Sequence, residues 1–370
     1  MRTKHVRNRK NLYRKLTILG VSAAVAIAGV HWLATSQAAT PSASIEAESG
    51  TIAGNNKILL QQAGASGSGS VRFGGGEAAS CDQAGIQKIV DSVSASSLEA
   101  YLRKLVQDDS KPTPNELISR HVSSPGNQIK VDWAKQQYTA MGLQVVNQAF
   151  TSGGFNLNNA VGRLAGSNPN VLYAVGGHID AINSQDENVA GDPAPGAIDD
   201  GSGVVVAMEA ARVLKPFQSC LKSTIDFIGF NDEEEDSGGA DKYIADLSGK
   251  TLKGVYNVDM VSYSPGGVMC DIHRYDDATR DKPLADKLAA VNTKYGVNLQ
   301  MSAEAYHEDD TDTWNFWNAG MSALYTNECT TDDNYPGYHS TDDTIKYVNF
   351  EALAKNTKIF VAALAELASQ

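Results

Sequence analysis

Histidine and aspartate residues stand at the ends of two of the most apolar stretches of the chain. His178 closes the run VLYAVGGH and Asp180 follows it, while Asp259 closes the run KGVYNVD. Alternate residues of a strand point to one face, so Asp180 could orient the imidazole of His178. Because zinc in proteins is bound by imidazole nitrogen and carboxylate oxygen, these strand ends predict part of a metal site.

Three further segments supply the same types of side chain. The loop PGAIDDGSG carries Asp199 and Asp200 just before an expected helix, where an aspartate often caps the helix. The apolar stretch STIDFIGF runs directly into NDEEED (231–236), and carboxylates crowded at a strand end are costly unless cations offset them. The loop YPGYHSTDDT adds His339. Two imidazoles and several carboxylates, in the order His, Asp, Glu-Glu, Asp, His, suit two zinc ions that share a bridging carboxylate.

The adjacent glutamates would add a reaction to such a site. A metal ion lowers the pKa of a bound water from about 15.7 towards 7. If one glutamate binds the metal, its neighbour can accept the proton of that water. The pattern therefore predicts a metal-bound water with a carboxylate beside it as proton acceptor.

The elements that must position these residues alternate between strand and helix. We expect strands at 171–178, 223–230, 253–261 and 267–273, and helices at 96–107, 127–142, 204–217, 281–296 and 350–368. Strands buried on both faces and alternating with helices are typical of an α/β fold. We predict a single three-layer αβα domain with a mixed, mostly parallel central sheet. Ligands of such sheets bind at the carboxyl ends of the strands, where the histidines and carboxylates above stand.

The composition is that of a globular protein with an acidic body. The chain has 370 residues, of which 42% are hydrophobic and 20% are charged. Seven of its 31 basic residues lie in the first 38 residues, which contain no acidic residue, so the other 24 face all 43 acidic residues. A surface that binds nucleic acid needs basic side chains to neutralise phosphates. Nucleic acid is therefore excluded as a partner.

The basic start of the chain leads into an apolar segment. The stretch from Arg2 to Lys15 precedes the apolar run 16–34, and the small residues Ala38 and Ala39 follow. This order is typical of a secretory signal peptide. The alternative is a membrane anchor, because about 18 apolar residues can just span a bilayer. We predict a signal peptide or anchor at 1–39, and a body that is secreted or is held outside the membrane through this segment alone.

Residues 40–80 differ in composition from the rest of the exported chain. Their short apolar runs are broken by Gly, Ser and Asn, and a GASGSGS tract follows. The EAESGT opening resembles that of some β-sandwich carbohydrate-binding modules, but such a sandwich usually needs around 100 residues. We therefore expect a Gly/Ser-rich spacer with strand remnants at 40–80, followed by one domain at 81–370.

The four cysteines, Cys81, Cys220, Cys270 and Cys329, all lie in the exported part. An even number of cysteines outside the cytosol suggests two disulfides with three possible pairings. None of them stands at the Cys-x-x-Cys spacing of a zinc site. We favour Cys81–Cys220 and Cys270–Cys329, although the sequence leaves the other pairings open.

The motifs together resemble those of the co-catalytic di-zinc aminopeptidases of bacteria, the leucyl aminopeptidase type. The wider superfamily includes glutaminyl cyclases, glutamate carboxypeptidases and the transferrin receptor. The resemblance runs from about Ser96 to the C-terminus and rests on GGHID, IDDGSG, FNDEEEDSGGA, NVDM and YHS. It implies a zinc-exopeptidase-like fold, a di-zinc peptidase domain at 81–370 and two zinc ions as cofactors.

The resemblance also implies the metal ligands. His178 and Asp259 would bind one zinc ion, and Glu234 and His339 would bind the other. Asp199, the Asp of IDDGSG that is followed by one residue and then a small-Ser-Gly triplet, would bridge the two ions.

Glu233 is implied to be the general base. In the family, a Glu-Glu pair is followed by a Gly-small pair, six and seven residues after the first Glu. Counting back from Gly239 and Ala240 selects Glu233 as the base and Glu234 as the ligand, although Glu235 makes this register ambiguous.

Two aspartates are implied to support the ligands, and one position departs from the family. Asp180 would orient His178, and Asp200 would follow Asp199 through a cis peptide bond. Within TDTWNFWNAG, Thr313 replaces a His that relatives often carry after Ser-Asp. That His is not a metal ligand, so the departure puts only the shape or stability of the pocket in doubt.

The implied reaction is hydrolysis of the N-terminal residue of a peptide, with a water that bridges the zinc ions and Glu233 as its base. We expect a monomer whose partners are the N-termini of peptides or proteins. A glutaminyl cyclase-like acyltransferase remains an alternative, although cyclases often carry a Trp soon after the Glu pair and this chain has Glu, Asp, Ser and Gly. A non-catalytic peptidase-like binding protein is the other alternative. Such proteins lack some of the metal ligands, whereas all five are present in this chain.

Overall fold

The structure is a computed structural model. It describes residues 57–59, 70–72, 79–107, 117–184, 192–267, 269–306, 310–329 and 335–370. The expected leader at 1–39 and most of the expected spacer lie outside these ranges. Within the spacer, the short strands β1 (Lys57–Leu59) and β2 (Ser70–Arg72) pair antiparallel. Within the ranges above, none of the helices combines the length and the apolar character that a membrane crossing requires.

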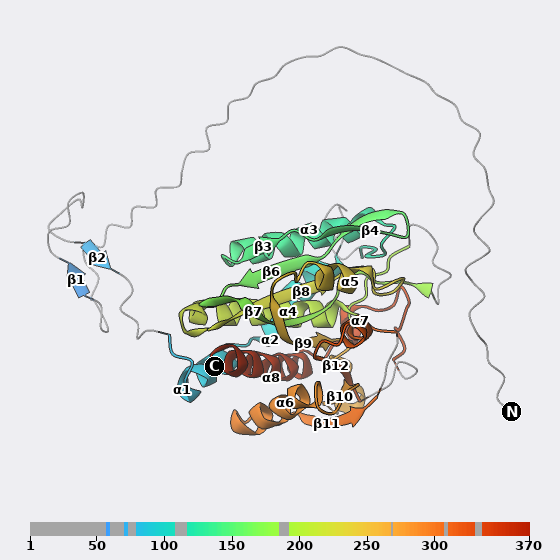
Figure 1. The fold of residues 1–370 in the computed structure, drawn as a ribbon. Coiled ribbons are helices and arrows are strands. Elements are labelled where there is room, and N and C mark those ends of the chain that lie inside the picture. The colour runs from blue at the N-terminus through green and yellow to red at the C-terminus, as the bar shows by residue number, and fades with distance from the viewer. Residues whose placement is uncertain are drawn as a thin grey trace, which may run out of the picture. The chain divides into compact units, whose positions relative to one another are not determined.

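An eight-stranded sheet runs through the body of the protein (Figure 1). Its strands are β3 (Gln144–Val146), β6 (Ala160–Leu164), β7 (Asn168–His178), β8 (Ser223–Phe230), β9 (Thr251–Val258), β10 (Cys270–Tyr275), β11 (Gln300–Ala305) and β12 (Ala323–Glu328). Their order is β11-β10-β12-β9-β7-β8-β6-β3. The pairs β8–β7, β7–β9, β9–β12 and β10–β11 are parallel. The pairs β10–β12, β6–β8 and β3–β6 are antiparallel. The predicted mixed, mostly parallel sheet is confirmed.

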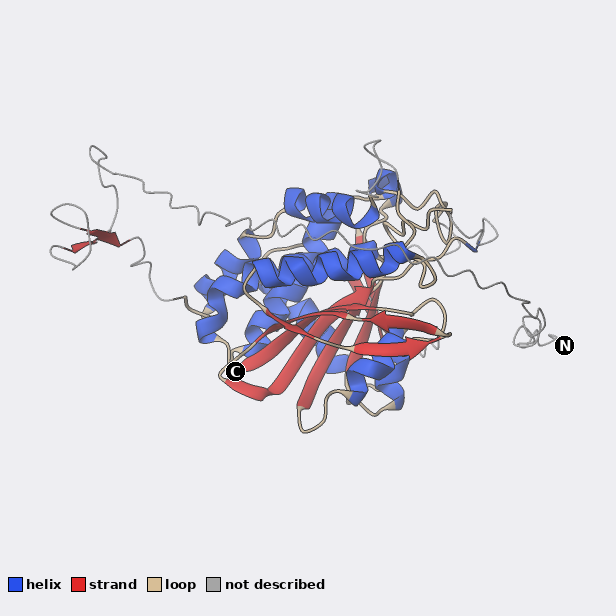
Figure 2. Ribbon diagram, turned by 90° about the horizontal axis from the view of Figure 1, so that it is seen from above, coloured by secondary structure: helices blue, strands red, loops and turns tan. Residues whose placement is uncertain are grey.

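Helices lie on both sides of the sheet, which gives the predicted three layers (Figure 2). They are α1 (Gln83–Asp91), α2 (Ala95–Val106), α3 (Pro125–Ala140), α4 (Gly201–Leu214), α5 (Gly238–Ala245), α6 (Lys282–Lys294), α7 (Asp312–Asn318) and α8 (Phe350–Ala368). α5 and α7 pack on one face of the sheet, and the other helices pack on the opposite face. A separate hairpin, β4 (Ala149–Ser152) and β5 (Phe155–Asn158), contacts α5.

Two hydrophobic cores follow from the two-residue period of the strands. In β8, Ile225 and Phe227 point to the core beneath α4 and α8, whereas Ile228 and Phe230 point to the core beneath α5 and α7. All eight residues of β8 are buried. Burial on both faces explains why this strand reads as one continuous apolar run.

Several expected elements differ from the structure by a few residues at their ends; the strand expected at 253–261, for example, runs from Thr251 to Val258. The helix expected to reach Phe217 ends at Leu214, and Lys215–Cys220 continue it as a 3-10 helix. Pro216 has no backbone N–H to donate to an α-helix, so the chain leaves the α-helical pattern there. The strand expected from residue 267 begins at Cys270, because Pro265–Gly267 form a 3-10 turn.

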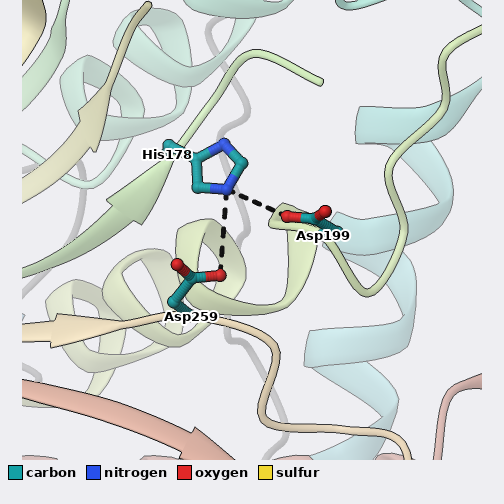
Figure 3. A group of neighbouring side chains, drawn as sticks. All are labelled: His178, Asp199 and Asp259. Atoms are coloured by element: carbon teal, nitrogen blue, oxygen red, sulfur yellow. Dashed lines mark hydrogen bonds and ion pairs between the residues drawn. The ribbon is translucent and has the colours of Figure 1, made fainter. Parts of the chain in front are cut away.

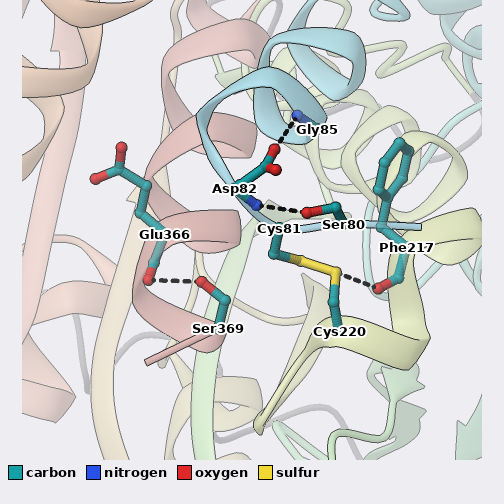
Figure 4. The surroundings of a disulfide bond; sticks show 8 residues. All are labelled: Ser80, Cys81, Asp82, Gly85, Phe217, Cys220, Glu366 and Ser369. Atoms are coloured by element: carbon teal, nitrogen blue, oxygen red, sulfur yellow. Dashed lines mark hydrogen bonds between the residues drawn. A yellow bond between two sulfur atoms is a disulfide. The ribbon is translucent and has the colours of Figure 1, made fainter. Parts of the chain in front are cut away.

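Both favoured disulfides are present. Cys81–Cys220 ties the segment before α1 to the end of the 3-10 helix after α4 (Figure 4). Beside it, the carboxylate of Asp82 accepts a hydrogen bond from the backbone N–H of Gly85 and caps α1. Cys270–Cys329 joins the first residue of β10 to the residue after β12. All four cysteines are therefore paired.

Candidate metal centre

The five predicted ligands meet at one edge of the sheet, where the central parallel strands end. His178 is the last residue of β7, and Asp259 directly follows β9. Glu234 follows β8, and Asp199 lies just before α4. His339 lies in a turn beyond β12. Segments far apart in the sequence thus bring the ligands into two neighbouring groups.

The first group, which we call the strand cluster, consists of His178, Asp199 and Asp259 (Figure 3). Nε2 of His178 lies 3.0 Å from Oδ1 of Asp199 and 3.8 Å from Oδ1 of Asp259. All three residues are buried, and the side chain of His178 is only 3% exposed.

The second group, the loop cluster, consists of Asp199, Glu234 and His339. Nε2 of His339 lies 3.1 Å from Oδ2 of Asp199 and 3.1 Å from Oε2 of Glu234. The side chain of His339 is 20% exposed. Asp199 belongs to both clusters and presents a different oxygen to each imidazole, which is the arrangement of a bridging carboxylate.

The spacing and the types of donor atom fit a metal ion in each cluster. Donors bound to one tetrahedral zinc ion at about 2.0–2.2 Å lie roughly 3.4 Å apart, and the contacts described above span 3.0 to 3.8 Å. Oε1 of Glu234 is buried and has no hydrogen-bond partner among the described residues. A buried carboxylate oxygen in that state is costly unless a cation offsets it. Imidazole and carboxylate donors are the set that zinc prefers.

The part of the chain that builds this centre matches a known family. A family model described as peptidase family M28 matches residues 159–364, which is more than half of the chain. This chain belongs to peptidase family M28. The resemblance inferred from the motifs is therefore confirmed, and the protein is a peptidase.

Two curated relatives illustrate the range of the family. The peptidase is 26% identical over 303 residues to a probable leucine aminopeptidase of Trichophyton verrucosum, a match that covers 76% of this chain and 77% of the relative. It is 30% identical over 228 residues to a probable zinc metalloprotease of Pyrenophora tritici-repentis, with 57% of this chain and 52% of the relative covered. These similarities support zinc as the metal of the centre.

Solved structures confirm the fold of the peptidase. LapB from Legionella pneumophila superposes with a TM-score of 0.67 at 23% identity, over 78% of this chain and 76% of that chain. The glutaminyl cyclase of Bacteroides thetaiotaomicron superposes with a TM-score of 0.59 at 16% identity, over 74% of this chain and 98% of that chain. Both share the three-layer fold, and one of them is named a glutaminyl cyclase, so the fold alone does not separate a peptidase from a cyclase.

Asp180 touches both a ligand and the glutamate pair. Its main-chain oxygen lies 3.2 Å from Nδ1 of His178, and its Oδ1 lies 3.8 Å from the same nitrogen. The expected contact with the imidazole is thus made more closely by the carbonyl group than by the carboxylate. The carboxylate accepts hydrogen bonds from the backbone N–H groups of Glu233 and Glu234, each at 3.2 Å. Asp180 therefore holds the turn after β8 against the end of β7.

Asp200 joins three segments of the peptidase beneath the ligands. Its carboxylate accepts hydrogen bonds from the backbone N–H groups of His178 at 3.0 Å, Gly203 at 2.8 Å and Met260 at 3.3 Å. The Asp199–Asp200 peptide bond is cis, as the resemblance implies. Asp200 thus fixes the ends of β7 and β9 to the start of α4.

Glu233 lies beside the strand cluster but outside both ligand sets. Its Oε2 is 3.9 Å from Nε2 of His178, and its side chain is 8% exposed. Burial raises the pKa of Glu233 well above its usual range; His178 lowers it, and Glu234 and Asp259 raise it further. A glutamate whose pKa is raised is suited to accept a proton near neutral pH.

The imidazoles and carboxylates of the clusters shift one another's pKa values. Burial alone would lower the pKa of His178, but Glu233 and Asp199 raise it well above 6.5. Burial also lowers the pKa of His339, but the carboxylates of Asp199 and Glu234 outweigh this effect and raise it to about 10. Burial raises the pKa of Asp199, yet the two imidazoles outweigh that effect and lower it. The imidazoles therefore hold protons that a metal ion must displace.

Arg120 is a buried cation near the centre that the sequence analysis did not single out. It is 0% exposed, and its Nε donates a hydrogen bond to the carbonyl oxygen of Pro195 at 2.9 Å. Its Nη2 donates to the carbonyl oxygen of Gly196. These bonds hold the loop that leads to Asp199. Arginine side chains are mostly exposed, so nothing in the sequence pattern signalled this position.

Two buried carboxylates were also missed. Asp312 is 0% exposed, and neither of its oxygens has a hydrogen-bond partner in the described ranges. Burial raises its pKa well above the usual range; His178 lowers it, and the carboxylates of Asp180 and Asp200 raise it further. The one sequence feature that could have indicated Asp312 was its place in TDT, where relatives often have Ser-Asp-His. The second is Asp343, four residues after His339, which accepts hydrogen bonds from the loop of Asp199.

The remaining polar residues of the motifs lie outside both clusters. Glu235, which left the register ambiguous, is 48% exposed and lies 3.4 Å from the ring of His121. His273 is buried and contacts the hydroxyl group of Thr326 at 3.0 Å. Thr313, where relatives often have His, is buried. The structure thus leaves Glu233 and Glu234 as the two glutamates of NDEEED that face the centre.

Proposed function

We propose that the protein is an exported zinc aminopeptidase that removes N-terminal residues from peptides. The observation that carries this proposal is the position of Asp199, which presents one carboxylate oxygen to each imidazole while the carboxylate of Glu233 lies beside them. The relatives named as leucine aminopeptidases support free N-termini as the substrate class.

The side chains of the centre divide the work of this reaction. The strand cluster would hold one zinc ion and the loop cluster the other, with Asp199 as the shared ligand. Such ions would polarise the scissile carbonyl and lower the pKa of the attacking water. Glu233 accepts the proton of the attacking water and returns it to the leaving amine. Asp180 keeps Glu233 in place through the hydrogen bond to its backbone.

Metal content and substrate class test this proposal together. We expect close to two zinc ions per chain and release of p-nitroaniline from aminoacyl-p-nitroanilides with a free amine. A chelator should abolish the release, and added zinc should restore it. Blocking the α-amine of the same substrate with an acetyl group should also abolish release, because an exopeptidase of this class acts on a free N-terminus.

Replacing the base isolates its role from metal binding. Glu233→Gln keeps the size of the side chain and removes its ability to accept a proton. We expect two zinc ions to remain bound and turnover to fall by about 10²–10⁴-fold. The matched control is Glu235→Gln, two residues away and exposed, which should keep full activity. If Glu235→Gln were the inactive variant instead, the assignment of the base would be wrong.

The two alternative functions correspond to different results. One zinc ion per chain, no release from any free-amine substrate and cyclisation of an N-terminal glutamine would indicate a cyclase. Zinc binding without either reaction would indicate a binding protein on a peptidase frame.

Export is the remaining part of the proposal. The leader at 1–39 and the two disulfides support it, because disulfides persist mainly outside the cytosol. Mass spectrometry of the mature N-terminus separates the two forms: a start near residue 40 indicates a cleaved signal peptide, and an intact start in the membrane fraction indicates an anchor. We also propose a monomer, which light scattering after size-exclusion chromatography tests.

A further inference from the structure

The loop that carries Asp199 is held by a residue 144 positions later in the chain. The two carboxylate oxygens of Asp343 accept hydrogen bonds from consecutive backbone N–H groups, that of Ile198 at 2.9 Å and that of Asp199 at 3.0 Å. The backbone N–H of Ala197 donates to the carbonyl oxygen of Asp343 at 3.1 Å. Three successive residues of the loop are therefore bound to this single aspartate.

Asp343 is itself fixed from the opposite side. It is 1% exposed, and the hydroxyl group of Tyr335 donates a hydrogen bond to its Oδ1. The ring of Tyr335 is buried between two other tyrosines, with centroids 5.0 Å from that of Tyr263 and 5.4 Å from that of Tyr347. The aspartate therefore cannot change its orientation without losing the bond to Tyr335.

In the sequence, His339 lies midway between Tyr335 and Asp343. Its φ angle is +50°, in the left-handed region that residues other than glycine seldom adopt. Such a backbone conformation persists where surrounding contacts fix it. The ring of Tyr338 stacks on that of His339 with centroids 3.7 Å apart. We call residues 335–343 the clasp, because its two ends are joined by a hydrogen bond and its middle presents His339.

We infer that Asp343 is a positioning residue that sets the bridging carboxylate of Asp199 at the correct distance from His339. This inference rests on the proposed function. Both ligands belong to the loop cluster, one from the loop before α4 and the other from the clasp. The carboxylate of Asp343 is bonded directly to the first and lies four residues from the second, so it ties the two segments together.

The chemistry requires a carboxylate at this position. Two N–H donors converge on the two oxygens, and a carboxylate is the side chain that offers an acceptor at both ends. An asparagine of the same shape would place an NH₂ group against one of the two N–H groups. One buried donor of the Asp199 loop would then be left unsatisfied, and the loop would move to relieve it.

The effect should fall on one cluster more than on the other. His178 and Asp259 stand at the ends of neighbouring strands and are tied together through Asp200, independently of the clasp. Loss of the hydrogen bonds between Asp343 and the Asp199 loop therefore leaves two of the three ligands of the strand cluster in place. In the loop cluster, the same loss allows Asp199 to move relative to His339.

Zinc titration of Asp343→Asn tests this inference. At buffered free zinc, wild type should show two tight sites. The variant should keep one site at wild-type affinity and bind the second ion about 10–100-fold more weakly, the usual cost of losing a side chain that orients a metal ligand. Tyr335→Phe should shift the same site by a smaller factor. The matched control is Tyr243→Phe, which loses the same type of hydrogen bond, from Tyr243 to Asp226, within the core beneath α5 and α7, and should leave both sites unchanged.

Each result has one meaning. Wild type that binds no zinc would overturn the proposed function itself. If wild type binds two ions and Asp343→Asn binds both with wild-type affinity, or loses both equally, the positioning role is wrong while the proposed function stands. If circular dichroism shows that Asp343→Asn does not fold, Tyr335→Phe decides, and unchanged zinc affinity in that variant would also overturn the inference.

Discussion

The two clusters are built from different kinds of element, although they share Asp199. His178 and Asp259 stand at the ends of β7 and β9, and these strands pair in parallel up to Gly176 and Asn257, two residues before each ligand. The hydrogen bonds of the sheet therefore bring the two side chains together. In the loop cluster, no pairing of strands brings the ligands together. The side chain of its histidine, His339, is 20% exposed, whereas that of His178 is 3% exposed.

This difference indicates what holds each cluster in shape. The strand cluster is a consequence of the sheet, because β7 and β9 are buried at the ends that carry His178 and Asp259. The loop cluster depends on single side chains: Asp180 binds the backbone of Glu234, and Asp343 binds the backbone of Asp199. A ligand site made from loops is easier to open, and loops and lids are drawn from the less stable parts of a protein. We therefore expect the two zinc sites to differ in affinity and in mobility.

Removing the shared ligand should have the largest effect, because it damages both clusters at once. We expect Asp199→Ala to lose both tight zinc sites and more than about 10³-fold in turnover, since the metal ions supply several kcal/mol of transition-state stabilisation. The measurement is zinc content after dialysis together with turnover on an aminoacyl-p-nitroanilide. Retention of one tight zinc ion would show that the clusters are more independent than the geometry indicates. Asp342→Ala, at an exposed aspartate beside Asp343, is the control that should keep both ions.

The pH dependence of the chelated protein should come next in size. In the absence of metal, the pKa of His339 is raised from 6.5 to about 10, and that of Glu233 is also raised. A group whose pKa is raised by folding stabilises the folded state below its unfolded pKa, and this contribution is lost as the pH rises through the folded pKa. The free energy of unfolding of chelated protein should therefore fall by a few kcal/mol, roughly, between pH 6.5 and 10.

Zinc should remove this dependence, because the imidazoles bind the metal in their neutral form at every pH in the window. Urea unfolding with and without chelator measures both curves. His273 contributes little in this window: burial lowers the pKa of its folded form to about 3, and the unfolded imidazole is also mostly neutral above its pKa of 6.5. Stability of the chelated protein that stays flat or rises over this interval would contradict the protonation of the clusters.

Removing the imidazoles one at a time compares the clusters directly. His339→Ala leaves the strand cluster intact, and His178→Ala leaves the loop cluster intact. We expect the strand cluster that remains in His339→Ala to bind zinc about tenfold more tightly than the loop cluster that remains in His178→Ala. The reason is that zinc binding to the loop cluster must order loop residues, and ordering even one residue costs ~1–2 kcal/mol. His121→Ala, at an imidazole outside both clusters, should bind two ions as wild type does. Equal affinities in the two histidine variants would show that strand and loop ligands are equally well ordered.

The same difference explains what the sequence could predict. His178 and Asp259 were found because a ligand-type side chain at the end of an apolar run is visible in the chain itself. Their proximity followed from the rule that parallel strands end at one edge. The three-layer fold was predictable for the same reason, since strands buried on both faces alternate with helices along the chain.

Residues that act across long distances could not be predicted in this way. Asp342 and Asp343 are neighbours of the same type, yet Asp342 pairs with Lys346 at the surface and Asp343 is buried against the loop of Asp199. The contact that distinguishes them joins positions 144 residues apart. Arg120 gave no signal either, because its burial depends on carbonyl groups that only the folded loop presents.

The smallest expected effect is on hydrogen exchange, and it compares the clusters without any substitution. The backbone N–H groups of the clasp are bonded within short turns, such as Tyr338 to Tyr335 and Asp343 to Ser340, whereas those of β7 belong to the ladder of the sheet. Removal of zinc should therefore speed exchange severalfold at 335–343, and exchange in β7 should stay nearly constant.

Mass spectrometry of peptides from chelated and zinc-loaded protein measures this exchange. Equal acceleration at the clasp and in β7 would mean that zinc stabilises the whole body and that the strand cluster has no advantage. The Asp343→Asn variant sharpens the test. Because the bond between the clasp and the loop of Asp199 is weakened there even with zinc present, its clasp should exchange quickly before the chelator is added. A clasp that exchanges slowly in that variant would show that His339 is held by zinc alone.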